Sequence, residues 1–332
     1  MGIQWFPGHM HLTRKAIAER IKNIDVVIEL LDARLPGSSA NPMLAELTQG
    51  KPALKLLNKQ DLADPARTAL WLAHFNSLPG TQAVALDASV AGAAKTLVAA
   101  CHALAPSRGG GGAGLAKPMR ALVCGIPNVG KSTLINSLVG KRATKTGDEA
   151  GVTKQEQRIA LADDFYLYDT PGMLWPRIIV AQSGYHLAAS GAVGRNAYDD
   201  VEVALELLVV LKQHYAALLQ ARFKLPGTPA EIAALPEEQL LGEIARQRGT
   251  LLGKGQPNLQ KAAETIIGEF RSATLGRITL ETPSAFAQWL AEGKTADAQR
   301  QAKKDALPPK RRTRPALLPT RFAERLPARK PR

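Results

Sequence analysis

Residues 125–133, with the sequence GIPNVGKST, have the residue types of a phosphate-binding loop. They match the pattern G-x4-G-K-[ST], in which glycines let the backbone approach the phosphates and successive N–H groups bind the anion at the start of a helix. We expect Lys131 to reach the β- and γ-phosphates as a catalytic group and Ser132 to hold Mg²⁺. An incidental glycine turn is the weaker interpretation, because the segment follows an apolar run and opens a helical pattern. The residues expected to contact the nucleotide here are Asn128, Val129, Gly130, Lys131, Ser132 and Thr133.

A second segment, Asn58-Lys59-Gln60-Asp61, has residue types that select a nucleotide base. The Asp61 carboxylate can accept hydrogen bonds from the N1–H and N2–H₂ groups of guanine, whereas adenine offers no such pair of donors. We expect Asn58 to act with Asp61, and Lys59 to lie along the base and support the loop. After the next apolar run, Ala88 is placed to offer its backbone amide to guanine O6, although Asp87 replaces the serine usual before it. The NKxD pattern alone would indicate only a turn, but a phosphate loop in the same chain makes a guanine site the better prediction.

A third segment, Asp169-Thr170-Pro171-Gly172, is expected to complete the pocket. Asp169 would hold Mg²⁺ through water, and the Gly172 amide would sense the γ-phosphate. Upstream, Thr153 is a candidate catalytic residue and Mg²⁺ ligand, although many loop threonines have no such role. Met173 stands where signalling GTPases place a glutamine that orients the attacking water. Because an apolar side chain cannot position water, we expect slow intrinsic hydrolysis until a partner or a remote residue completes the site.

Alternating strand and helix patterns predict the elements that position these motifs. The apolar runs at residues 25–31, 52–57, 83–86 and 120–124 are typical of parallel strands, residues 157–161 and 165–168 of a hairpin, and residues 11–22 and 131–139 of helices. Beyond residue 176 the patterns at residues 201–219, 229–235, 237–249 and 258–271 are helical. The sequence therefore predicts an α/β domain with a doubly wound, mostly parallel sheet, followed by an all-α domain.

The motif order predicts how the nucleotide domain is connected. NKxD precedes the phosphate loop, whereas in Ras-like GTPases the phosphate loop leads and NKxD trails. We therefore predict a circularly permuted Ras-like P-loop GTPase domain at residues 1–176, with a glycine-rich linker at residues 106–118, and a helical domain at residues 177–290. The chain after Gly172 then enters the helical region directly, so ordering of this segment by the γ-phosphate could reorient that region.

Charge and cysteine content limit the partners and the compartment. The chain of 332 residues has a net charge of +14, and residues 303–332 hold eleven Lys or Arg against two acidic residues. We predict that residues 291–332 form a largely disordered basic tail that suits a polyphosphate backbone, with a merely solubilising tail as the alternative. Two cysteines, Cys101 and Cys124, are too few for a disulfide framework. With no apolar run long enough for a bilayer and no leader before Trp5, we expect a cytoplasmic protein without membrane contact.

The motif order and the N-terminal Trp5-Phe6-Pro7-Gly8-His9-Met10 resemble the circularly permuted GTPases of the YlqF/RbgA family, the ribosome biogenesis GTPase A group. The similarity spans roughly residues 3–280 and includes Gly268-Glu269-Phe270-Arg271 and, at its end, residues 275–281, LGRITLE. The resemblance implies GTP hydrolysis coupled to late assembly of the large (50S) ribosomal subunit. It also implies that the helical domain contacts ribosomal RNA.

The same resemblance implies roles for two further residues. His9 would serve in place of the missing glutamine, and Asn128 would help to bind K⁺. The sequence alone favours a structural or exposed role for a histidine so near the chain start, although a pKa near neutrality suits proton transfer. We expect a monomer whose cofactors are GTP or GDP with Mg²⁺, and whose partners are ribosomal RNA and ribosomal proteins.

Two other functions fit parts of the sequence. An ATP-using P-loop enzyme would share the phosphate loop, but Asn58 and Asp61 argue against it. A nucleotide-gated RNA-binding scaffold with incidental hydrolysis remains open, because Met173 offers no group to activate water.

Overall fold

The computed structural model describes residue 3 and residues 9–86, 92–106, 118–139 and 157–306. The chain divides into two compact units, Met1–Lys294 and Thr295–Arg332, and the first contains every strand of the sheet. Within the described residues, no helix combines the length and the apolar character needed to cross a lipid bilayer.

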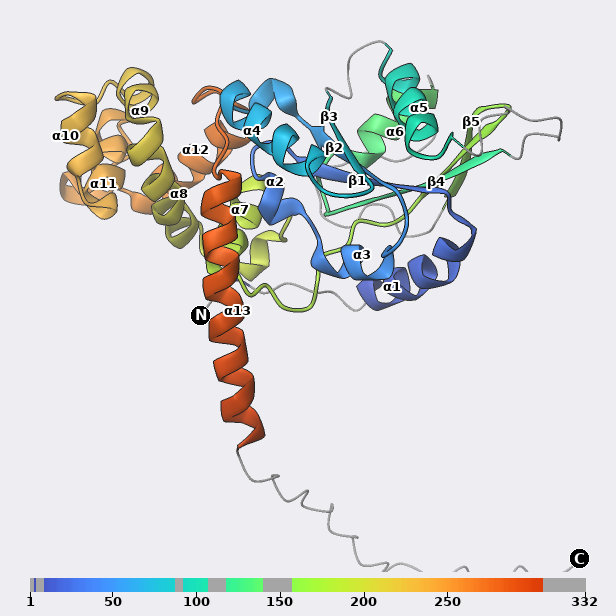
Figure 1. Cartoon of the computed structure of the whole chain (residues 1–332). Coiled ribbons are helices and arrows are strands. Elements are labelled where there is room, and N and C mark those ends of the chain that lie inside the picture. Colours follow the sequence, from blue (N-terminus) through green and yellow to red (C-terminus); the bar gives the residue numbers. More distant parts are fainter. Residues whose placement is uncertain (1–2, 4–8, 87–91, 107–117, 140–156, 307–332) are drawn as a thin grey trace, which may run out of the picture. The chain divides into compact units, whose positions relative to one another are not determined.

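A six-stranded sheet with helices around it forms one part of the first unit (Figure 1). Its strands are β1 (Val26–Asp32), β2 (Ala53–Asn58), β3 (Thr81–Ala85), β4 (Met119–Gly125), β5 (Gln157–Ala162) and β6 (Phe165–Asp169). Their spatial order is β3-β2-β1-β4-β6-β5, and only the β5–β6 pair is antiparallel. Every residue of β1 is buried, which explains why that strand appears as an unbroken apolar run with Glu29 as its one charge before Asp32.

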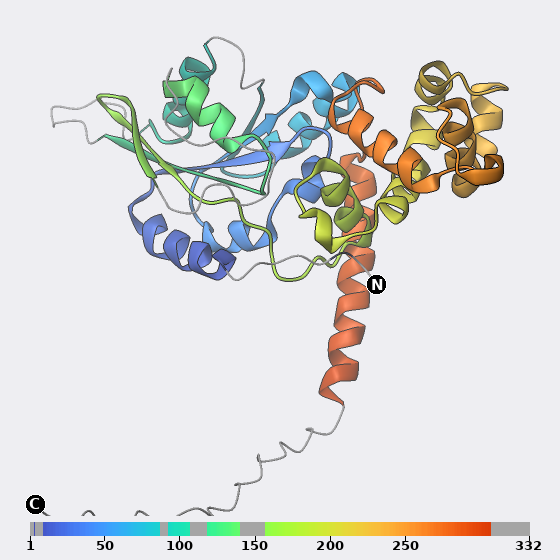
Figure 2. The same cartoon turned by 180° about the vertical axis from the view of Figure 1, so that it is seen from behind.

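Helices cover both faces of this sheet. In Figure 1, α5 (Ala93–Leu104) and α6 (Lys131–Val139) lie on one face, while α1 (His9–Arg20) and α3 (Pro42–Leu47) lie on the other; Figure 2 shows the same layers from behind. A further helix, α4 (Pro65–Asn76), packs on β3 and buries Trp71 and Phe75. The predicted doubly wound α/β fold is therefore confirmed.

The strand order agrees with the permuted arrangement. The three strands that come first in sequence lie on one side of β4, and the two that come last lie on its other side. Because β1, β2, β4 and β6 are parallel neighbours, their carboxyl ends meet at one edge, which is where ligands bind in open α/β sheets. All three predicted nucleotide motifs follow strands that end at this edge.

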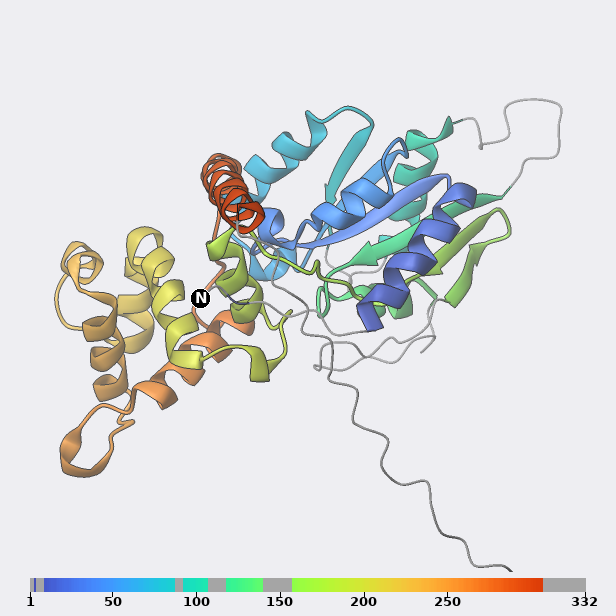
Figure 3. The ribbon, with the colours of Figure 1, turned by 90° about the horizontal axis from the view of Figure 1, so that it is seen from below.

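Among the described residues after β6, every regular element is a helix, as the sequence predicts. They are α7 (Ala181–Ser190), α8 (Asp200–His214), α9 (Ala216–Phe223), α10 (Pro229–Ala234), α11 (Glu237–Gln247) and α12 (Leu259–Arg271), and most are seen from below in Figure 3. The sequence did not predict α7. The single helix predicted at residues 201–219 is wrong, because the chain breaks at Tyr215, with φ −135° and ψ 26°. The break brings the Tyr215 hydroxyl to Asp64, 2.9 Å away.

The predicted start of the disordered tail is also wrong. Residues 291–305 belong to the helix α13 (Pro283–Asp305), whose composition is rich in Ala, Gln and Lys, which are good helix formers. Residues 307–332, which hold most of the basic residues of the predicted tail, lie outside the described part of the chain.

Between α12 and α13 the chain returns to the sheet through residues 277–281, which we call the return segment. Residues 278–281 are all buried. The Leu280 amide donates to the Arg34 carbonyl at 2.7 Å, and the Ile278 amide donates to the Leu62 carbonyl at 3.1 Å. The segment thus joins the backbone that follows β1 to the backbone that follows β2.

The return segment ends in a buried carboxylate, Glu281, which is 1% exposed. It accepts hydrogen bonds from the Ser38 amide at 2.7 Å and from the Ser38 hydroxyl, and it lies 2.9 Å from His186 Nδ1. The Trp71 indole donates to the Glu281 carbonyl at 3.0 Å. One residue therefore links the start of α2 (Pro36–Ser39), α4 and α7.

We predict that Glu281→Ala destabilises the protein by about 3–5 kcal/mol, because it leaves several buried polar groups without their acceptor. The measurement is urea-induced unfolding of the full chain. Glu243→Ala is the control, since Glu243 pairs with Arg246 at a partly exposed position and should cost less than about 1 kcal/mol. Equal midpoint shifts for the two variants would contradict the prediction.

Candidate nucleotide-binding site

The phosphate loop lies between β4 and α6, with Lys131 as the first residue of the helix. Gly130 has φ +95°, and a Cβ atom there would collide with Asn58 Nδ2. Asn128 also has a left-handed backbone, with φ 56°. Left-handed conformations are costly for residues other than glycine, so the loop is held by its surroundings in a shape that the isolated chain would not prefer.

The NKxD segment supplies part of that support. Asn58, the last residue of β2, donates from Nδ2 to the Val129 carbonyl at 2.8 Å. Lys59 donates from Nζ to the Asn128 carbonyl at 2.7 Å. The base-reading segment and the phosphate loop are thus hydrogen-bonded to each other.

Two residues that the sequence analysis did not single out lie beside Lys59: Asp32 binds it, and Arg34 pairs with Asp32. Asp32 ends β1 beside Asn58, its register partner in β2. Its carboxylate accepts bonds from Arg34 Nη2 at 2.7 Å and Nε at 2.9 Å, and lies 3.0 Å from Lys59 Nζ. Burial raises the pKa of Asp32, but the two cations outweigh burial and hold that pKa well below its usual range. The signal that could have revealed this pair is a charged Asp-Ala-Arg sequence directly after an apolar strand.

Asp169 ends β6 and is fully buried, and neither oxygen of its carboxylate has a hydrogen-bond partner among the described residues. Lys131 Nζ lies 3.6 Å from Oδ1. Burial raises the pKa of Asp169, and the Lys131 ammonium only partly opposes that shift. Buried carboxylate oxygens without hydrogen bonds are rare and costly, so this pair of oxygens fits a hydrated divalent cation.

The DTPG segment lies directly against the phosphate loop. A Cβ atom on Gly172 would come within 2.9 Å of Pro127 Cα and N, so only glycine fits this approach. The next residue, Met173, donates its amide to the Gly125 carbonyl at 3.1 Å, and its carbonyl accepts from Asn41 Nδ2 at 2.8 Å. Its side chain is buried, at 1% exposure, and belongs to the apolar core. The Met173 side chain therefore packs in the core and cannot orient water, while its backbone anchors the segment.

The return segment supports the base-reading loop from the other side. Arg277 donates from Nε to the Ala63 carbonyl and from Nη2 to the Gln60 carbonyl, both at 2.8 Å. Asp61, between these two carbonyls in sequence, is exposed. The loop backbone is therefore fixed while the carboxylate faces solvent, where a base could reach it.

The remaining predicted residues have different positions. Asn128 donates from Nδ2 to the Gly191 carbonyl at 2.9 Å, so its side chain turns toward the helical region. Ser132 and Thr133 lie in the first turn of α6. His9 begins α1, but its side chain lies outside the described part of the structure, as do Ala88 and Thr153 entirely. The structure thus brings together Asn58, Lys59, Asp61, residues 128–133, Asp169 and Gly172.

Comparison with known proteins places these motifs in a family context. Residues 120–226 match the family described as 50S ribosome-binding GTPase, and the match begins within β4, the strand before the phosphate loop. Ribosome biogenesis GTPase A of Bacillus cereus is 41% identical over 291 residues, covering 87% of this chain and 96% of the relative. The protein of the same name from Priestia megaterium is 40% identical, covering 87% and 99%.

More distant relatives and solved structures agree. Mitochondrial ribosome-associated GTPase 1 of Xenopus tropicalis is 31% identical, covering 83% of this chain and 94% of the relative. A GDP-bound structure of YlqF has a TM-score of 0.57 at 23% identity, covering 81% of this chain and 99% of that one. GNP-bound YlqF from T. maritima has a TM-score of 0.53 at 23% identity, covering 82% and 98%. At this identity the two structures show a shared fold.

The Asp32 cluster generates a prediction about pH. Asp32→Asn should lower the free energy of unfolding by about 3–5 kcal/mol near neutral pH, because Arg34 then stays buried without its carboxylate partner. The native pKa of Asp32 is lowered, so its stabilising contribution is present above the unfolded pKa of about 4 and is lost as the pH falls below that value. Urea unfolding of both proteins across this range should show the difference shrinking only in acid. A difference that does not change with pH would contradict this account.

Proposed function

The chain belongs to the ribosome biogenesis GTPase A family, and from that premise we propose that it acts in late maturation of the large (50S) ribosomal subunit, binding ribosomal RNA in a GTP-dependent manner. Relatives 40–41% identical over most of the chain are ribosome biogenesis GTPases, so it is a GTP-hydrolysing ribosome assembly factor. The finer proposal is supported by the match of residues 120–226 to the family described as 50S ribosome-binding GTPase, and its dependence on GTP by the base-reading and phosphate-binding loops that meet at one sheet edge.

Guanine selection is assigned to Asp61, with Asn58 and Lys59 as its support. Asp61 is exposed and its loop backbone is fixed by Arg277, so the carboxylate can accept two hydrogen bonds from the guanine edge. Asn58 binds the Val129 carbonyl, which places the base relative to the phosphates. We propose that the Ala88 amide adds a bond to guanine O6.

Phosphate and magnesium binding are assigned to the start of α6 and the end of β6. Lys131 neutralises the β- and γ-phosphates, and the amides from Asn128 to Thr133 surround them. Mg²⁺, held by Ser132, Thr153 and Asp169, would offset charge that develops on the phosphate oxygens. The Asp169 oxygens, which have no hydrogen bond to the described residues, support this assignment.

Hydrolysis needs a group that Met173 does not provide. We propose that His9, at the start of α1, orients the attacking water in its place, and that K⁺ bound with the help of Asn128 adds positive charge near the transferring phosphoryl group. The carbonyl oxygen of an Asn side chain is a suitable ligand for K⁺, and the Asn128 amide nitrogen is occupied by Gly191. The ribosome would then stimulate hydrolysis by ordering these groups.

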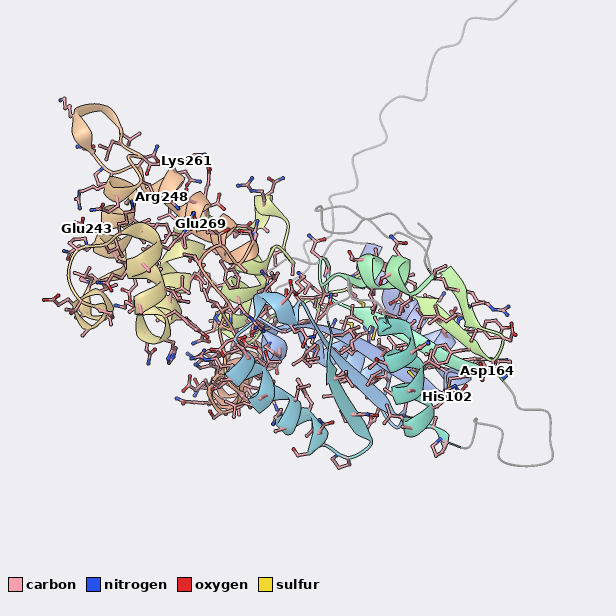
Figure 4. The ribbon with its side chains drawn as sticks, turned by 90° about the horizontal axis from the view of Figure 1, so that it is seen from above. His102, Asp164, Glu243, Arg248, Lys261 and Glu269 are labelled. Carbon is pink, nitrogen blue, oxygen red and sulfur yellow. The ribbon has the colours of Figure 1, made fainter. Side chains whose placement is uncertain are left out.

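The distribution of charge supports an RNA partner. Residues 177–290 contain eleven basic and eleven acidic side chains, whereas residues 303–332 contain eleven basic and two acidic ones. On the helical region the charges are interspersed, as Figure 4 shows for Glu243, Arg248, Lys261 and Glu269. We therefore propose that the tail supplies the non-specific attraction to RNA, while the helical region supplies the shape complementarity that positions the RNA.

The nucleotide-gated scaffold stays as a second function, because Met173 is buried and inert. The two functions differ in turnover: an assembly GTPase hydrolyses GTP faster when it binds its subunit, and a scaffold does not.

The base assignment predicts a change of nucleotide. Asp61→Asn should weaken GTP binding by roughly 10- to 100-fold, since a charged acceptor of two bonds is lost. Binding of xanthosine triphosphate should strengthen, because an amide can donate to its second carbonyl. Fluorescence titration with both nucleotides measures this. The matched control is Asp163→Asn, in the exposed turn between β5 and β6 at the opposite end of β6. If Asp61→Asn kept the preference for GTP, the assignment of guanine selection to Asp61 would be wrong.

The partner assignment predicts co-sedimentation. The full chain should pellet with large subunits, and not with small ones, when a non-hydrolysable GTP analogue is bound, and should be released with GDP. Removing residues 303–332 should weaken binding and reduce its dependence on salt, because fewer counterions are displaced. Turnover is measured in parallel with each subunit. Binding to both subunits alike would refute the large-subunit proposal, and binding without any rise in turnover would favour the scaffold.

A further inference from the structure

The phosphate loop is hydrogen-bonded to the C-terminal end of α7. The Gly191 carbonyl, at the left-handed C-cap of this helix, accepts from Asn128 Nδ2 at 2.9 Å. Asn128 is the residue whose own backbone is left-handed, with φ 56°. A shift of Gly191 would therefore act directly on Asn128, a strained residue of the nucleotide pocket.

Arg271, the last residue of α12, fixes that end of α7. Its guanidinium donates from Nε to the Ala189 carbonyl and from Nη2 to the Ala188 carbonyl, both at 2.8 Å. A positive charge bound to carbonyls at a helix C-terminus is a strong and directional cap, and the Ala188 carbonyl accepts from it in addition to accepting from the Gly191 amide. A third bond, at 3.1 Å from Nη2 to the Tyr198 hydroxyl, sets the plane of the guanidinium.

The backbone of Arg271 is tied to the opposite side of the pocket. Its carbonyl accepts from Arg34 Nη1 at 3.2 Å, and Arg34 is paired with Asp32. Asp32 in turn binds Lys59, which donates to the Asn128 carbonyl. These contacts form a closed ring. It starts at the side chain of Asn128 and ends at the backbone carbonyl of the same residue.

We propose that Arg271 is a positioning residue for the phosphate loop, acting through the end of α7 on Asn128. The inference rests on the proposed function only in that the same pocket binds guanine nucleotide. Because coupling between sites is reciprocal, nucleotide in the pocket stabilises the junction of α7 and α12, and any partner that moves this junction changes nucleotide affinity.

The test is a double-mutant cycle on GDP affinity, measured by fluorescence titration of the full chain without ribosomes. Arg271→Gln should weaken GDP binding by about tenfold, within the range usual for coupled sites, and Arg271→Lys should fall between it and wild type. In an Asn128→Gly background, where the left-handed backbone is kept but the bond to Gly191 is gone, Arg271→Gln should have little further effect.

The matched control is Arg222→Ala. Arg222 also makes two bonds to a residue of α12, Glu269, at 2.8 and 2.7 Å, but on a face of the helix away from the pocket. It should leave GDP affinity unchanged. Equal affinity of wild type and folded Arg271→Gln, or an equal loss in both backgrounds, would overturn the proposal. Failure of wild type itself to bind GDP would instead overturn the proposed function.

A second measurement needs no variant. Hydrogen–deuterium exchange of the wild type should show slower exchange at the amides of Gly191 and Ala192, which close the end of α7, when GDP is added. The Ile232 amide in α10, remote from this junction, is the reference and should not change. No protection at the α7 end under saturating GDP would overturn the proposal even if the Arg271 variants did not fold.

Discussion

The ammonium group of Lys59 lies between the ends of three chain segments that are far apart in sequence. It contacts the Asp32 carboxylate after β1 and the Asn128 carbonyl in the phosphate loop, while its own backbone, left-handed at φ 61°, follows β2. A cation placed between a buried carboxylate and a strained loop satisfies both. Arg34 adds a second cation to Asp32, and through its bond to Arg271 at the C-terminal end of α12 it brings the helical region into the same network. The pocket, the sheet edge and the helical region therefore share one set of polar contacts.

Much of this could be predicted from the sequence, because the motifs have local causes. The strand before each motif is a short apolar run, and GIPNVGKST specifies its loop through glycine geometry. The antiparallel β5–β6 hairpin follows from two alternating runs around Asp163 and Asp164. The permuted strand order follows from the order of the motifs alone.

The parts that could not be predicted depend on contacts between distant segments. The helical pattern of α7 is interrupted by Gly184 and His186. Both residues are there because of tertiary contacts: Gly184 packs on Ile3, and His186 binds Glu281. The helix break at Tyr215 depends on Asp64, more than a hundred residues earlier. Asp32 and Arg34 are ordinary charged residues in the sequence, and only the fold shows that they are buried. The turn of Asn128 toward Gly191 likewise depends on where α7 ends.

The return segment has a consequence for the order in which the protein becomes functional during synthesis. All six strands are complete by Asp169, yet the Gln60 and Ala63 carbonyls beside Asp61 gain their bonds from Arg277 only when residues 277–281 have been made. Since domains fold from the N-terminus as the chain emerges, a nascent chain that lacks this segment has a finished sheet but a guanine site whose loop lacks the Arg277 bonds. The last support of the base-reading loop therefore arrives only after the whole helical region has been made. A truncated product would carry all three nucleotide motifs with a less firmly held base-reading loop.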